Sequence, residues 1–412
     1  MRGLVYEFSV LKYLAAKAYF SIFRRGRGFF PGLKFHHNLA LPKLHNDRWV
    51  RVRTLLCGIC GSDQNMLKGQ ESFSMEPYAS FPFVPGHENV GEIVSVGNSV
   101  AGLKIGDRVV VNPVMSCAVH DRKLCTSCAA GHNSLCENFG DQSTLLGAGL
   151  SLGYHKSTGG GWSEFFVAHE SQVHKISQDI PLKRAVLVDP LCAALQAVGS
   201  LASGKNEEKS VVIFGMGAIG LLCVVAIRAL KLPWKIIAVY RHEFQAELSR
   251  KMGADLILKS DKNLIDSFCN VSGAIRRNIS LGKPVLEGGV DAVLDCIASA
   301  ETLDLSLRFA KTKGQVMMLG TGTDLSKVDP TPLWFREVTL SGSSMSRVII
   351  DPRDGNRKSC YSLAVELLPM LNLESLVSHE FELADYRNAL STAMNKKGQK
   401  VVKVVFNPSK GK

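Results

Sequence analysis

The 412-residue sequence lacks several features that would mark whole classes of protein. It carries no internal repeat and no low-complexity tract, so nothing in it is typical of a solenoid or a disordered linker. Residues 1–23 do not read as a secretory leader, because Glu7, Lys12 and Lys17 interrupt the apolar residues and no small-residue cleavage site follows. Eleven cysteines, an odd number, then predict reduced thiols in a cytoplasmic protein rather than a disulfide framework.

The sequence also lacks a basic run long enough to identify a partner, although its net charge is +12. A charge of this size fits nucleic acid, an anionic membrane surface or a phosphorylated ligand. Together with a closely spaced cysteine pair, it makes a zinc-bearing nucleic-acid binder a rival interpretation. The basic residues are scattered and form no aromatic–basic module, so we do not expect nucleic acid as a partner.

One apolar run is long enough to resemble a membrane span. Residues 210–227 carry no charge, but three glycines at a phosphate-binding spacing divide them into a short strand and a helix. The run therefore predicts a nucleotide-binding turn rather than a membrane helix.

Length and pattern predict an α/β protein with two domains. Short β-rich runs at 51–56, 92–96 and 108–111 come first. Apolar strands then alternate with helical stretches, which is typical of a parallel sheet with crossover helices. The strands expected there are 211–214, 236–239, 292–294 and 316–319, and the helices 219–230, 243–252 and 301–310. We expect a mainly β domain over 1–190, an α/β domain over 191–341 and a segment of mixed character over 342–412.

A glycine-rich turn follows the first of these apolar strands and opens an apolar helix. In Gly215-Met216-Gly217-Ala218-Ile219-Gly220, the first glycine permits a tight turn and the second lets the backbone approach a pyrophosphate. The third permits close packing of helix on strand, and the helix N-terminus faces the phosphates. We predict that a dinucleotide binds at Gly215, Gly217, Ala218, Ile219 and Gly220; a glycine turn without ligand is the alternative.

The residues after the second strand indicate which dinucleotide binds. An NAD site needs a carboxylate there for the ribose 2′-hydroxyl, whereas this strand ends in Tyr240-Arg241-His242 and Glu243 comes three residues late. A tyrosine can stack or hydrogen-bond, and an arginine can pair with a 2′-phosphate. We therefore favour NADP(H) over NAD(H), with Tyr240 and Arg241 as cofactor-binding residues; an Arg241 that is only a surface charge is the alternative.

Four cysteines cluster between residues 113 and 137. Cys125 and Cys128 have the spacing of a tight chelate, and two further thiols lie close by in the sequence. Four thiolates with such spacings suit a tetrahedral structural zinc ion. The predicted ligands are Cys117, Cys125, Cys128 and Cys136, against the alternative of unrelated reduced thiols.

A second metal site can be assembled from Cys60 and His87. With one distant carboxylate these two would make a three-ligand zinc site with an open fourth position, as a catalytic zinc requires. Asp189, just before the proposed domain crossover, could supply that carboxylate. Spacing alone leaves the matter open, because a lone histidine is more often a satisfied core residue.

Eight motifs follow one another along the chain from about residue 49 onward: CGICGSD, PGHENVGEIVSVG, GDRVVVNP, the four-cysteine lobe, GGGWSEF, VDPLCAALQAV, GMGAIG and GGVDAVLDC. With them the sequence resembles the zinc-dependent medium-chain alcohol dehydrogenases, in the polyol and threonine dehydrogenase branch. The resemblance implies a GroES-like catalytic domain, completed by 342–412 and interrupted in sequence by a doubly wound Rossmann domain. It implies hydride transfer between a nicotinamide and an alcohol or carbonyl, two zinc ions per chain and a homodimer or homotetramer.

The resemblance also implies roles for single residues. Cys60 and His87 match the first two catalytic zinc ligands, and Glu88 matches a carboxylate that ligates the metal in some states or lies beside it. Asp189 stands where this branch has glutamate, and Cys57 matches no role beyond packing. Asp63 matches the acid that orients the ligand histidine, and Ser62 matches the hydroxyl that hydrogen-bonds the substrate oxygen.

Three departures from the family pattern accompany these matches. Asn65 replaces a relay histidine, and an amide cannot accept a proton near neutral pH, so the proton must leave through water or the cofactor ribose. Arg122 occupies an expected thiol position, so Cys117 must loop back to the lobe. Residues 9–34 form an insertion after the first strand. With the Asp189 substitution, these departures leave open a catalytically inactive NADPH-binding relative with a sensing or scaffold role.

The insertion contains a helical stripe of apolar residues. The stripe consists of Leu11, Leu14, Ala15, Ala18 and Ile22, with Lys12, Lys17, Arg24 and Arg25 around it. We expect the stripe to pack on its own protein, with contact of 9–30 with a membrane surface as the alternative and a roof over the substrate cleft as a third. Aromatic residues between the zinc ligands, Phe73, Tyr78, Phe81 and Phe83, indicate a bulky or apolar substrate unless they belong to the core.

Overall fold

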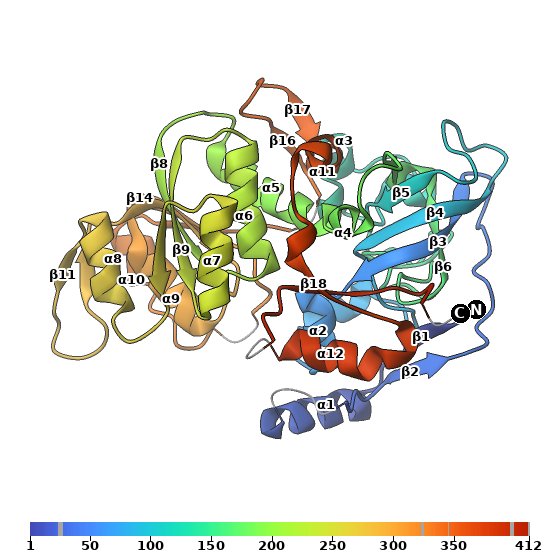
Figure 1. The fold of residues 1–412 in the computed structure, drawn as a ribbon, viewed down its shortest axis with the longest axis horizontal. Helices are drawn as coiled ribbons and strands as arrows, with labels where there is room; N and C mark the ends of the chain where they lie inside the picture. The colour runs from blue at the N-terminus through green and yellow to red at the C-terminus, as the bar shows by residue number, and fades with distance from the viewer. Residues whose placement is uncertain (24–27, 323–324, 345, 396–398, 411–412) are drawn as a thin grey trace. The chain divides into compact units, whose positions relative to one another are not determined.

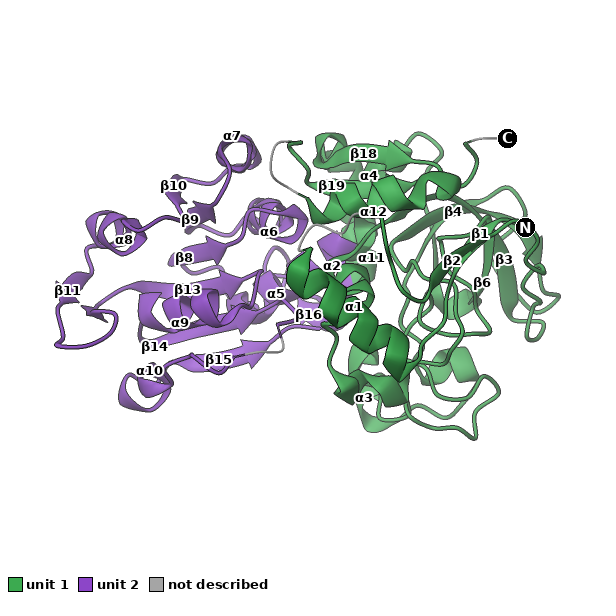
Figure 2. Ribbon diagram, turned by 90° about the horizontal axis from the view of Figure 1, so that it is seen from below, with its two compact units in different colours: residues 1–189, 361–412 green, residues 190–360 purple. Residues whose placement is uncertain are grey.

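The structure, a computed structural model, describes residues 1–23, 28–322, 325–344, 346–395 and 399–410. It divides into two compact units, Met1–Asp189 with Tyr361–Lys412 and Pro190–Cys360 (Figure 2). The first boundary lies beside the expected one at 190/191. The second differs from the expected boundary at 341/342, because the hairpin of β16 (Val348–Ile350) and β17 (Arg357–Ser359) belongs to unit 2. Its Ile349 and Ile350 pack closely against Gly199 and Gly204 of that unit.

Unit 1 is built on a seven-stranded sheet of order β18-β19-β3-β4-β5-β7, with β6 paired to β3 (Figure 1). Its strands are β3 (Trp49–Gly58), β4 (Asn89–Val96), β5 (Arg108–Val111), β6 (Phe165–His169), β7 (Val173–Lys175), β18 (Val377–Phe381) and β19 (Lys403–Phe406). Its helices are α2 (Gly61–Leu67), α3 (Thr126–Ala129), α4 (Leu182–Ala185), α11 (Cys360–Leu367) and α12 (Tyr386–Met394). Its 3₁₀ turns are η1 (Phe73–Tyr78), η2 (Cys117–His120), η3 (Asn133–Leu135), η4 (Glu170–Gln172), η5 (Leu368–Met370), η6 (Glu374–Leu376) and η7 (Leu383–Asp385).

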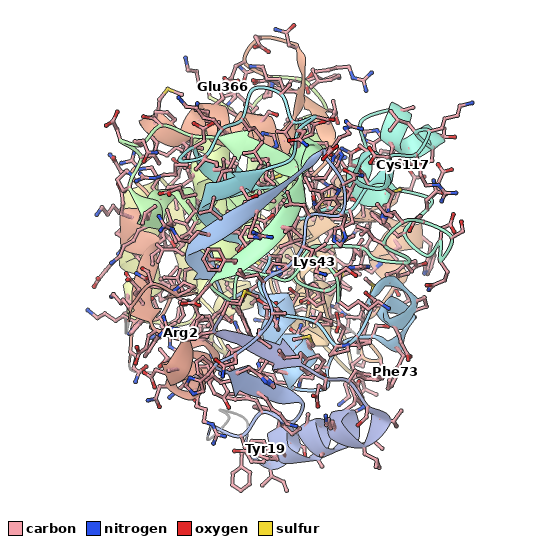
Figure 3. All side chains as sticks on the ribbon, turned by 90° about the vertical axis from the view of Figure 1, so that its right-hand side faces the viewer. Arg2, Tyr19, Lys43, Phe73, Cys117 and Glu366 are labelled. Atoms are coloured by element: carbon pink, nitrogen blue, oxygen red, sulfur yellow. The ribbon has the colours of Figure 1, made fainter. Side chains whose placement is uncertain are left out.

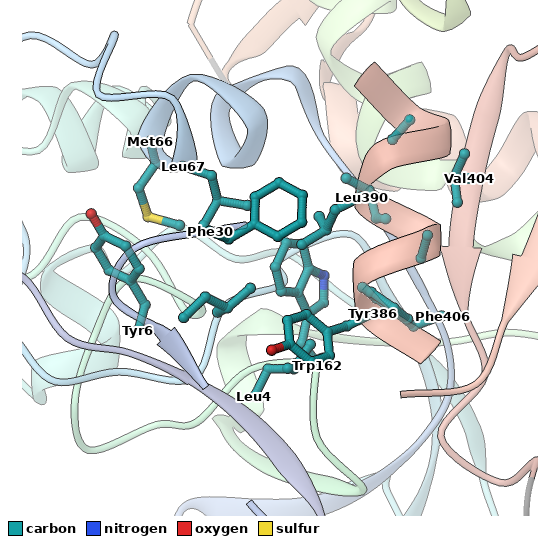
Figure 4. Close-up of a cluster of buried hydrophobic side chains, with 14 of the residues drawn as sticks. Leu4, Tyr6, Phe30, Met66, Leu67, Trp162, Tyr386, Leu390, Val404 and Phe406 are labelled. Carbon is teal, nitrogen blue, oxygen red and sulfur yellow. The ribbon is translucent and has the colours of Figure 1, made fainter. Parts of the chain in front are cut away.

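One core cluster of unit 1 joins segments from both ends of the chain (Figure 4). Leu4 from the N-terminus and Leu67 of α2 are buried with Leu390 of α12 and Phe406 of β19. Burying a side chain of this size contributes about 1.5–3 kcal/mol. The cluster therefore explains why the C-terminal segment belongs to the first unit rather than to the second.

Unit 2 is a six-stranded parallel sheet of order β10-β9-β8-β13-β14-β15, the doubly wound arrangement that the sequence predicts. The strands are β8 (Lys209–Phe214), β9 (Trp234–Tyr240), β10 (Leu256–Lys259), β13 (Val290–Asp295), β14 (Ala310–Met318) and β15 (Thr339–Gly342). The helices are α6 (Ala218–Ala229), α7 (Glu243–Met252), α8 (Leu264–Ser272), α9 (Ala300–Phe309) and α10 (Thr331–Phe335), and a small hairpin pairs β11 (Ile275–Arg277) with β12 (Val285–Glu287). Helix α5 (Val188–Ala202) begins in unit 1 and continues into unit 2.

The apolar run at 210–227 contributes to β8 and α6, as its glycines predict. Among the described residues, no helix is long and apolar enough to cross a membrane.

The insertion near the N-terminus is a helix between two paired strands. Strand β1 (Gly3–Tyr6) pairs antiparallel with β2 (Leu33–His36), and α1 (Val10–Ile22) lies between them in sequence. Ser9 caps the helix by accepting a hydrogen bond from the Lys12 N–H at 3.2 Å.

The expectation that the predicted stripe packs on its own protein is wrong. All five residues of the stripe are exposed, whereas the opposite face of α1, formed by Tyr13, Ala16 and Phe20, is buried. The rings of Tyr13 and Phe20 find ring partners in unit 1, at Phe73 and Phe30, so this face of the helix is the covered one. Arg24 and Arg25 lie outside the described residues.

Candidate active site

Strand pairing brings Cys60 and His87 together. Cys60 follows the end of β3 and His87 precedes the start of β4, and these strands pair antiparallel with Cys57 opposite Asn89. The end of one strand therefore lies beside the start of the other. Cys57 itself is fully buried in the core cluster of unit 1, in keeping with a packing role.

Three of the predicted ligands converge. Ligand atoms of Cys60, His87 and Glu88 all lie within 4.8 Å of one another, and His87 and Glu88 are buried. A thiol, an imidazole and a carboxylate at this separation are a donor set that zinc accepts. Asp189 lies outside this group, so its place as the third ligand stays a prediction beside that of Glu88.

The Asp63 carboxylate faces the ligand histidine. Its Oδ1 lies 3.6 Å from His87 Nδ1 and accepts a hydrogen bond from the Tyr154 hydroxyl at 3.2 Å. Its Oδ2 accepts a hydrogen bond from the Cys60 N–H at 2.8 Å, as part of the cap of α2. His87 Nδ1 is buried and, among the described residues, makes no hydrogen bond, so the imidazole presents its other nitrogen to Cys60.

The surroundings within the site raise the pKa of both His87 and Asp63. Burial lowers the pKa of His87, but the Asp63 carboxylate and Cys60 outweigh it and hold that pKa well above its usual value. Burial raises the pKa of Asp63, while His87 and the Cys60 N–H oppose the rise. The two side chains thus stabilise each other's charge in a buried place.

A buried lysine neutralises Glu88. Lys403 Nζ lies 2.7 Å from both carboxylate oxygens, and both side chains are almost fully buried. Lys403 begins β19, which pairs with β3 so that Val405 lies opposite Gly58. A Cβ on Gly58 would lie 1.9 Å from Glu88 Oε2, so only glycine leaves room for this pair.

Asp189 lies near the same charges without a bonded partner. Burial raises its pKa to about 7, His87 and Lys403 lower it, and Glu88 and Asp63 raise it. Within the described residues, no hydrogen bond or ion pair reaches its carboxylate. A cation would satisfy this group, whereas Glu88 already has Lys403.

The four lobe cysteines also converge, and Cys117 does loop back. Ligand atoms of Cys117, Cys125, Cys128 and Cys136 all lie within 4.8 Å of one another, which is the separation that one tetrahedral metal ion requires. The turn η2 carries Cys117 into the group, while the guanidinium of Arg122 pairs with the Asp141 carboxylate instead.

Backbone hydrogen bonds favour the thiolate of one lobe cysteine, Cys125, whereas burial raises the pKa of Cys128 and brings that of Cys136 to about 11. Cys125 Sγ accepts hydrogen bonds from the N–H groups of Cys128 and Glu137, each at 3.5 Å. Burial raises the pKa of Cys125, but these bonds outweigh it and bring the pKa to about 7. Cys117 Sγ accepts a further bond from Asn138 Nδ2 at 3.1 Å. A thiol ionised near neutral pH is ready to bind a metal ion.

The glycine turn of unit 2 has the predicted geometry. Gly215 has φ of 90°, a left-handed conformation that favours glycine. A Cβ on Gly220 would lie 2.2 Å from the Gly215 carbonyl oxygen, so the third glycine allows α6 to start against the turn. Gly217 is the N-cap of α6 and no side chain caps it, while Ala218 and Ile219 open the helix. Free N–H groups at this end suit a phosphate.

The predicted cofactor-binding arginine stands beside this turn. The Gly215 N–H donates to the Val239 carbonyl at the end of β9, and Tyr240 and Arg241 follow directly. The Arg241 side chain is exposed, and in the described part of the chain no carboxylate pairs with it. The Glu243 carboxylate already pairs with Lys259 Nζ at 2.9 Å and accepts a hydrogen bond from the Tyr240 hydroxyl at 3.3 Å.

Sequence reasoning missed three side chains of the site. Tyr154 donates a hydrogen bond to Asp63, and Lys403 pairs with Glu88. The third is Glu71, where burial and the nearby Asp63 charge raise the pKa to about 7. Lys403 could have been noticed in the sequence, because it is the one charged residue within the apolar run 401–406. No sequence pattern marks Tyr154 or Glu71 as part of the site.

Comparison with known proteins decides what this arrangement belongs to. The profile described as the alcohol dehydrogenase GroES-like domain matches residues 46–178, and that described as zinc-binding dehydrogenase matches residues 218–358. Together they cover more than half of the chain. The chain belongs to the zinc-dependent medium-chain dehydrogenases/reductases. It is an oxidoreductase of the alcohol dehydrogenase type, as its motifs predict.

Named relatives of this family are similar over three quarters of the chain or more. Sorbitol dehydrogenase of Arabidopsis thaliana is 27% identical over 87% of this chain and 88% of its own. (R,R)-butanediol dehydrogenase of Saccharomyces cerevisiae is 27% identical over 76% of this chain and 79% of its own. Galactitol-1-phosphate dehydrogenase from Escherichia coli is 22% identical, with a TM-score of 0.70 over 99% of this chain and 100% of its own, which shows a shared fold.

Proposed function

We propose that this dehydrogenase interconverts an alcohol and its aldehyde or ketone, with NADP(H) as hydride carrier and zinc at Cys60 and His87. The observation that carries the proposal is the convergence of Cys60, His87 and Glu88 with Asp63 behind the histidine. A zinc ion held there would supply a Lewis acid that stabilises negative charge on the substrate oxygen. NADPH as carrier would favour reduction of the carbonyl.

The chain's own residues would handle the proton. Burial and the Asp63 and Glu71 carboxylates hold the pKa of Tyr154 well above its usual value, and a side-chain hydrogen bond with Ser62, in α2 next to Asp63, opposes the rise. The contact supports Ser62 as the hydroxyl at the start of a path that would lead away from the substrate oxygen. Asn65 cannot accept the proton, so it would continue through water or the cofactor ribose. Asp63 would keep the His87 ring oriented throughout.

The third catalytic ligand is Asp189 or Glu88, and zinc content separates them. We expect protein purified without added metal or chelator to hold two zinc ions per chain. Cys60→Ala should remove one ion and Cys128→Ala the other, because the two groups are separate. If Asp189 is the ligand, Asp189→Asn removes the catalytic ion and Glu88→Gln keeps it; the reverse assigns Glu88. Cys269→Ser, outside both groups, is the control.

We further propose a substrate with an apolar or aromatic body. A row of rings leads from the ligand histidine: His87–Tyr154 at 5.7 Å, Tyr154–Phe83 at 5.4 Å, Phe83–Phe81 at 5.2 Å and Phe81–Phe8 at 5.0 Å. Of the four aromatics noted in sequence, Phe83 is core, while Phe73 and Tyr78 are exposed. Rings of this kind favour apolar partners.

Turnover tests the whole proposal. Aromatic alcohols and aldehydes should give a higher kcat/KM than sorbitol or xylitol, with NADP(H) preferred over NAD(H). A higher kcat/KM for the polyols would contradict the apolar substrate alone. Tight NADPH binding without turnover of any alcohol or carbonyl by zinc-loaded protein would instead favour an inactive, sensing relative.

A further inference from the structure

The helix α1 presents an apolar face that unit 1 leaves uncovered. Leu11, Leu14 and Ile22 are 80%, 53% and 73% exposed, and Ala15 and Ala18 between them are exposed as well. In Figure 1 the helix lies at the lower edge of unit 1. Scattered exposed apolar residues need no explanation, but a continuous stripe along a helix of three turns does.

The helix is held firmly in this orientation. Its opposite face packs into unit 1, where Phe20 joins the core cluster and contacts Phe30 at 6.1 Å between ring centroids. Tyr13 contacts Phe73 at 4.7 Å and donates a hydrogen bond to the Glu71 carbonyl at 3.2 Å. The stripe therefore faces outward because the other face is anchored, and it cannot turn inward without losing those contacts.

Basic side chains flank the stripe on both sides. Successive residues of a helix are rotated by about 100° around its axis. Viewed along this axis, Lys12 lies about 100° from Leu11 on one side, and Lys17 lies about 120° from Leu11 on the other. Lys12 bonds Glu7 at 2.7 Å, but Lys34 lies 3.6 Å from the same carboxylate, so this trio keeps a net positive charge. Lys17 is exposed, and among the described residues no acid pairs with it.

The surrounding sequence has charge of one sign. From Phe8 to Asn46 it contains lysines and arginines but neither aspartate nor glutamate. An aromatic group stands at the end of the helix, where Tyr19, labelled in Figure 3, contacts Phe23 and Phe29, each at 5.1 Å between ring centroids. Both phenylalanines are partly exposed. Aromatic rings and lysines at the edges of an apolar face are typical of a helix at a lipid–water boundary.

We propose that α1 docks unit 1 on an anionic lipid surface, with Leu11, Leu14 and Ile22 in the acyl boundary and Lys12 and Lys17 at the head groups. Complementary charge selects this occupant over the others. A nucleic acid would use the lysines but leave the leucines in water, and a second copy would bring the same lysines face to face. A bilayer with anionic lipids satisfies both the stripe and its flanks.

Flotation of the full zinc-loaded chain with lipid vesicles tests the proposal, and its readout requires no turnover. We expect binding to vesicles of phosphatidylcholine mixed with phosphatidylserine, much weaker binding to phosphatidylcholine alone, and loss of binding as salt rises. Leu14→Glu should weaken binding about tenfold or more, because it places a charge in the acyl boundary. Ile105→Glu, at an equally exposed isoleucine of unit 1, is the matched control and should change nothing.

Charge reversal supplies the second pair of variants. Lys17→Glu should weaken binding to the anionic vesicles about tenfold, and Lys156→Glu, at an exposed lysine of the same unit, should not. Because these residues are exposed, the thermal midpoint of each variant should match that of the parent protein. No binding to either vesicle, or equal effects of Leu14→Glu and Ile105→Glu, would overturn the proposal. So would a fall in solution mass with Leu14→Glu, which assigns the face to a second copy.

Discussion

At the scale of single residues, the Asp63 carboxylate connects several parts of the site. One oxygen accepts from the Cys60 N–H and so fixes the start of α2, while the other accepts from Tyr154 and faces His87. The same side chain thus holds one predicted zinc ligand through the backbone and orients the other through its ring. Lys403 does similar work for Glu88, from a strand more than three hundred residues away in sequence.

Asp63→Asn should weaken zinc binding and lower kcat/KM, each by roughly 10–100-fold, because the amide cannot stabilise charge on the His87 ring. Competition with a zinc chelator and steady-state kinetics measure the two effects. Asp261→Asn, at an exposed aspartate of unit 2, is the control. Unchanged chelator competition in Asp63→Asn would mean that Tyr154 and the fold orient His87 without the carboxylate.

His155 should make stability depend on pH. Its Nε2 donates to the Leu146 carbonyl at 3.0 Å and its Nδ1 accepts from the Ser157 N–H at 3.1 Å, so the folded state holds a neutral ring. Burial lowers its pKa from 6.5 to about 4. Because the folded pKa lies below the unfolded one, the unfolded state binds more protons between pH 4 and 6.5, and stability falls as pH falls through that window.

The expected loss from this histidine is about 3 kcal/mol on going from pH 7 to pH 4. Urea unfolding across this range measures it, and His155→Gln should flatten the slope while His37→Gln, at an exposed histidine, should not. An unchanged slope in His155→Gln would assign the pH dependence to other groups.

At the scale of elements, the ends of strands decide where chemistry occurs. The antiparallel pairing of β3 with β4 and with β19 gathers Cys60, His87 and Lys403 where the ends of these three strands meet. In unit 2, β8 and β9 run parallel, so the glycine turn and Tyr240 leave neighbouring strands at the same end. A β–turn–α unit of this kind leaves helix N–H groups free for phosphate.

The end of β9 should also set the choice of dinucleotide. Arg241→Ala should raise KM for NADPH at least tenfold and leave KM for NADH nearly unchanged, because only NADPH carries the 2′-phosphate that a guanidinium binds. Arg250→Ala, at an exposed arginine of α7, is the matched control. Equal losses for the two cofactors would make Arg241 a general phosphate contact, and no loss would make it a surface charge.

At the scale of the whole molecule, the parallel sheet ends in β15, which within the described residues pairs on one side only. In the sheet order β15 is last, and close to it in sequence Trp334 and Phe335 of α10 are 72% and 67% exposed. An open strand edge with large apolar neighbours favours pairing with another chain. We therefore retain the expectation of a homo-oligomer as a prediction about this edge.

Trp334→Glu should shift the protein toward a smaller species in light scattering after gel filtration. The reason is that a charge would be buried where the apolar rings meet a second chain. Met370→Glu, at a comparably exposed side chain of unit 1, should leave the mass unchanged. A parent protein that is already a monomer would contradict the prediction.

Local patterns could be predicted from the sequence because their geometry depends on neighbours in the chain. The glycine turn and helix α7 lie where spacing and periodicity place them, and the four cysteines gather as their spacing predicts. In α1 the periodicity identified an apolar stripe but not which face is covered. Tyr13, Ala16 and Phe20 share a face just as well, and only the core of unit 1 decides between the two.

The sequence by itself determined the family, the doubly wound sheet and the two groups of predicted metal ligands that converge, because these follow from short-range order along the chain. Tertiary structure alone decided that Lys403 neutralises Glu88 and that, within the described residues, no hydrogen bond or ion pair reaches the Asp189 carboxylate. It also decided that an apolar stripe faces outward. The physical reason is that strand register and core packing join residues hundreds of positions apart, and no local pattern encodes those contacts.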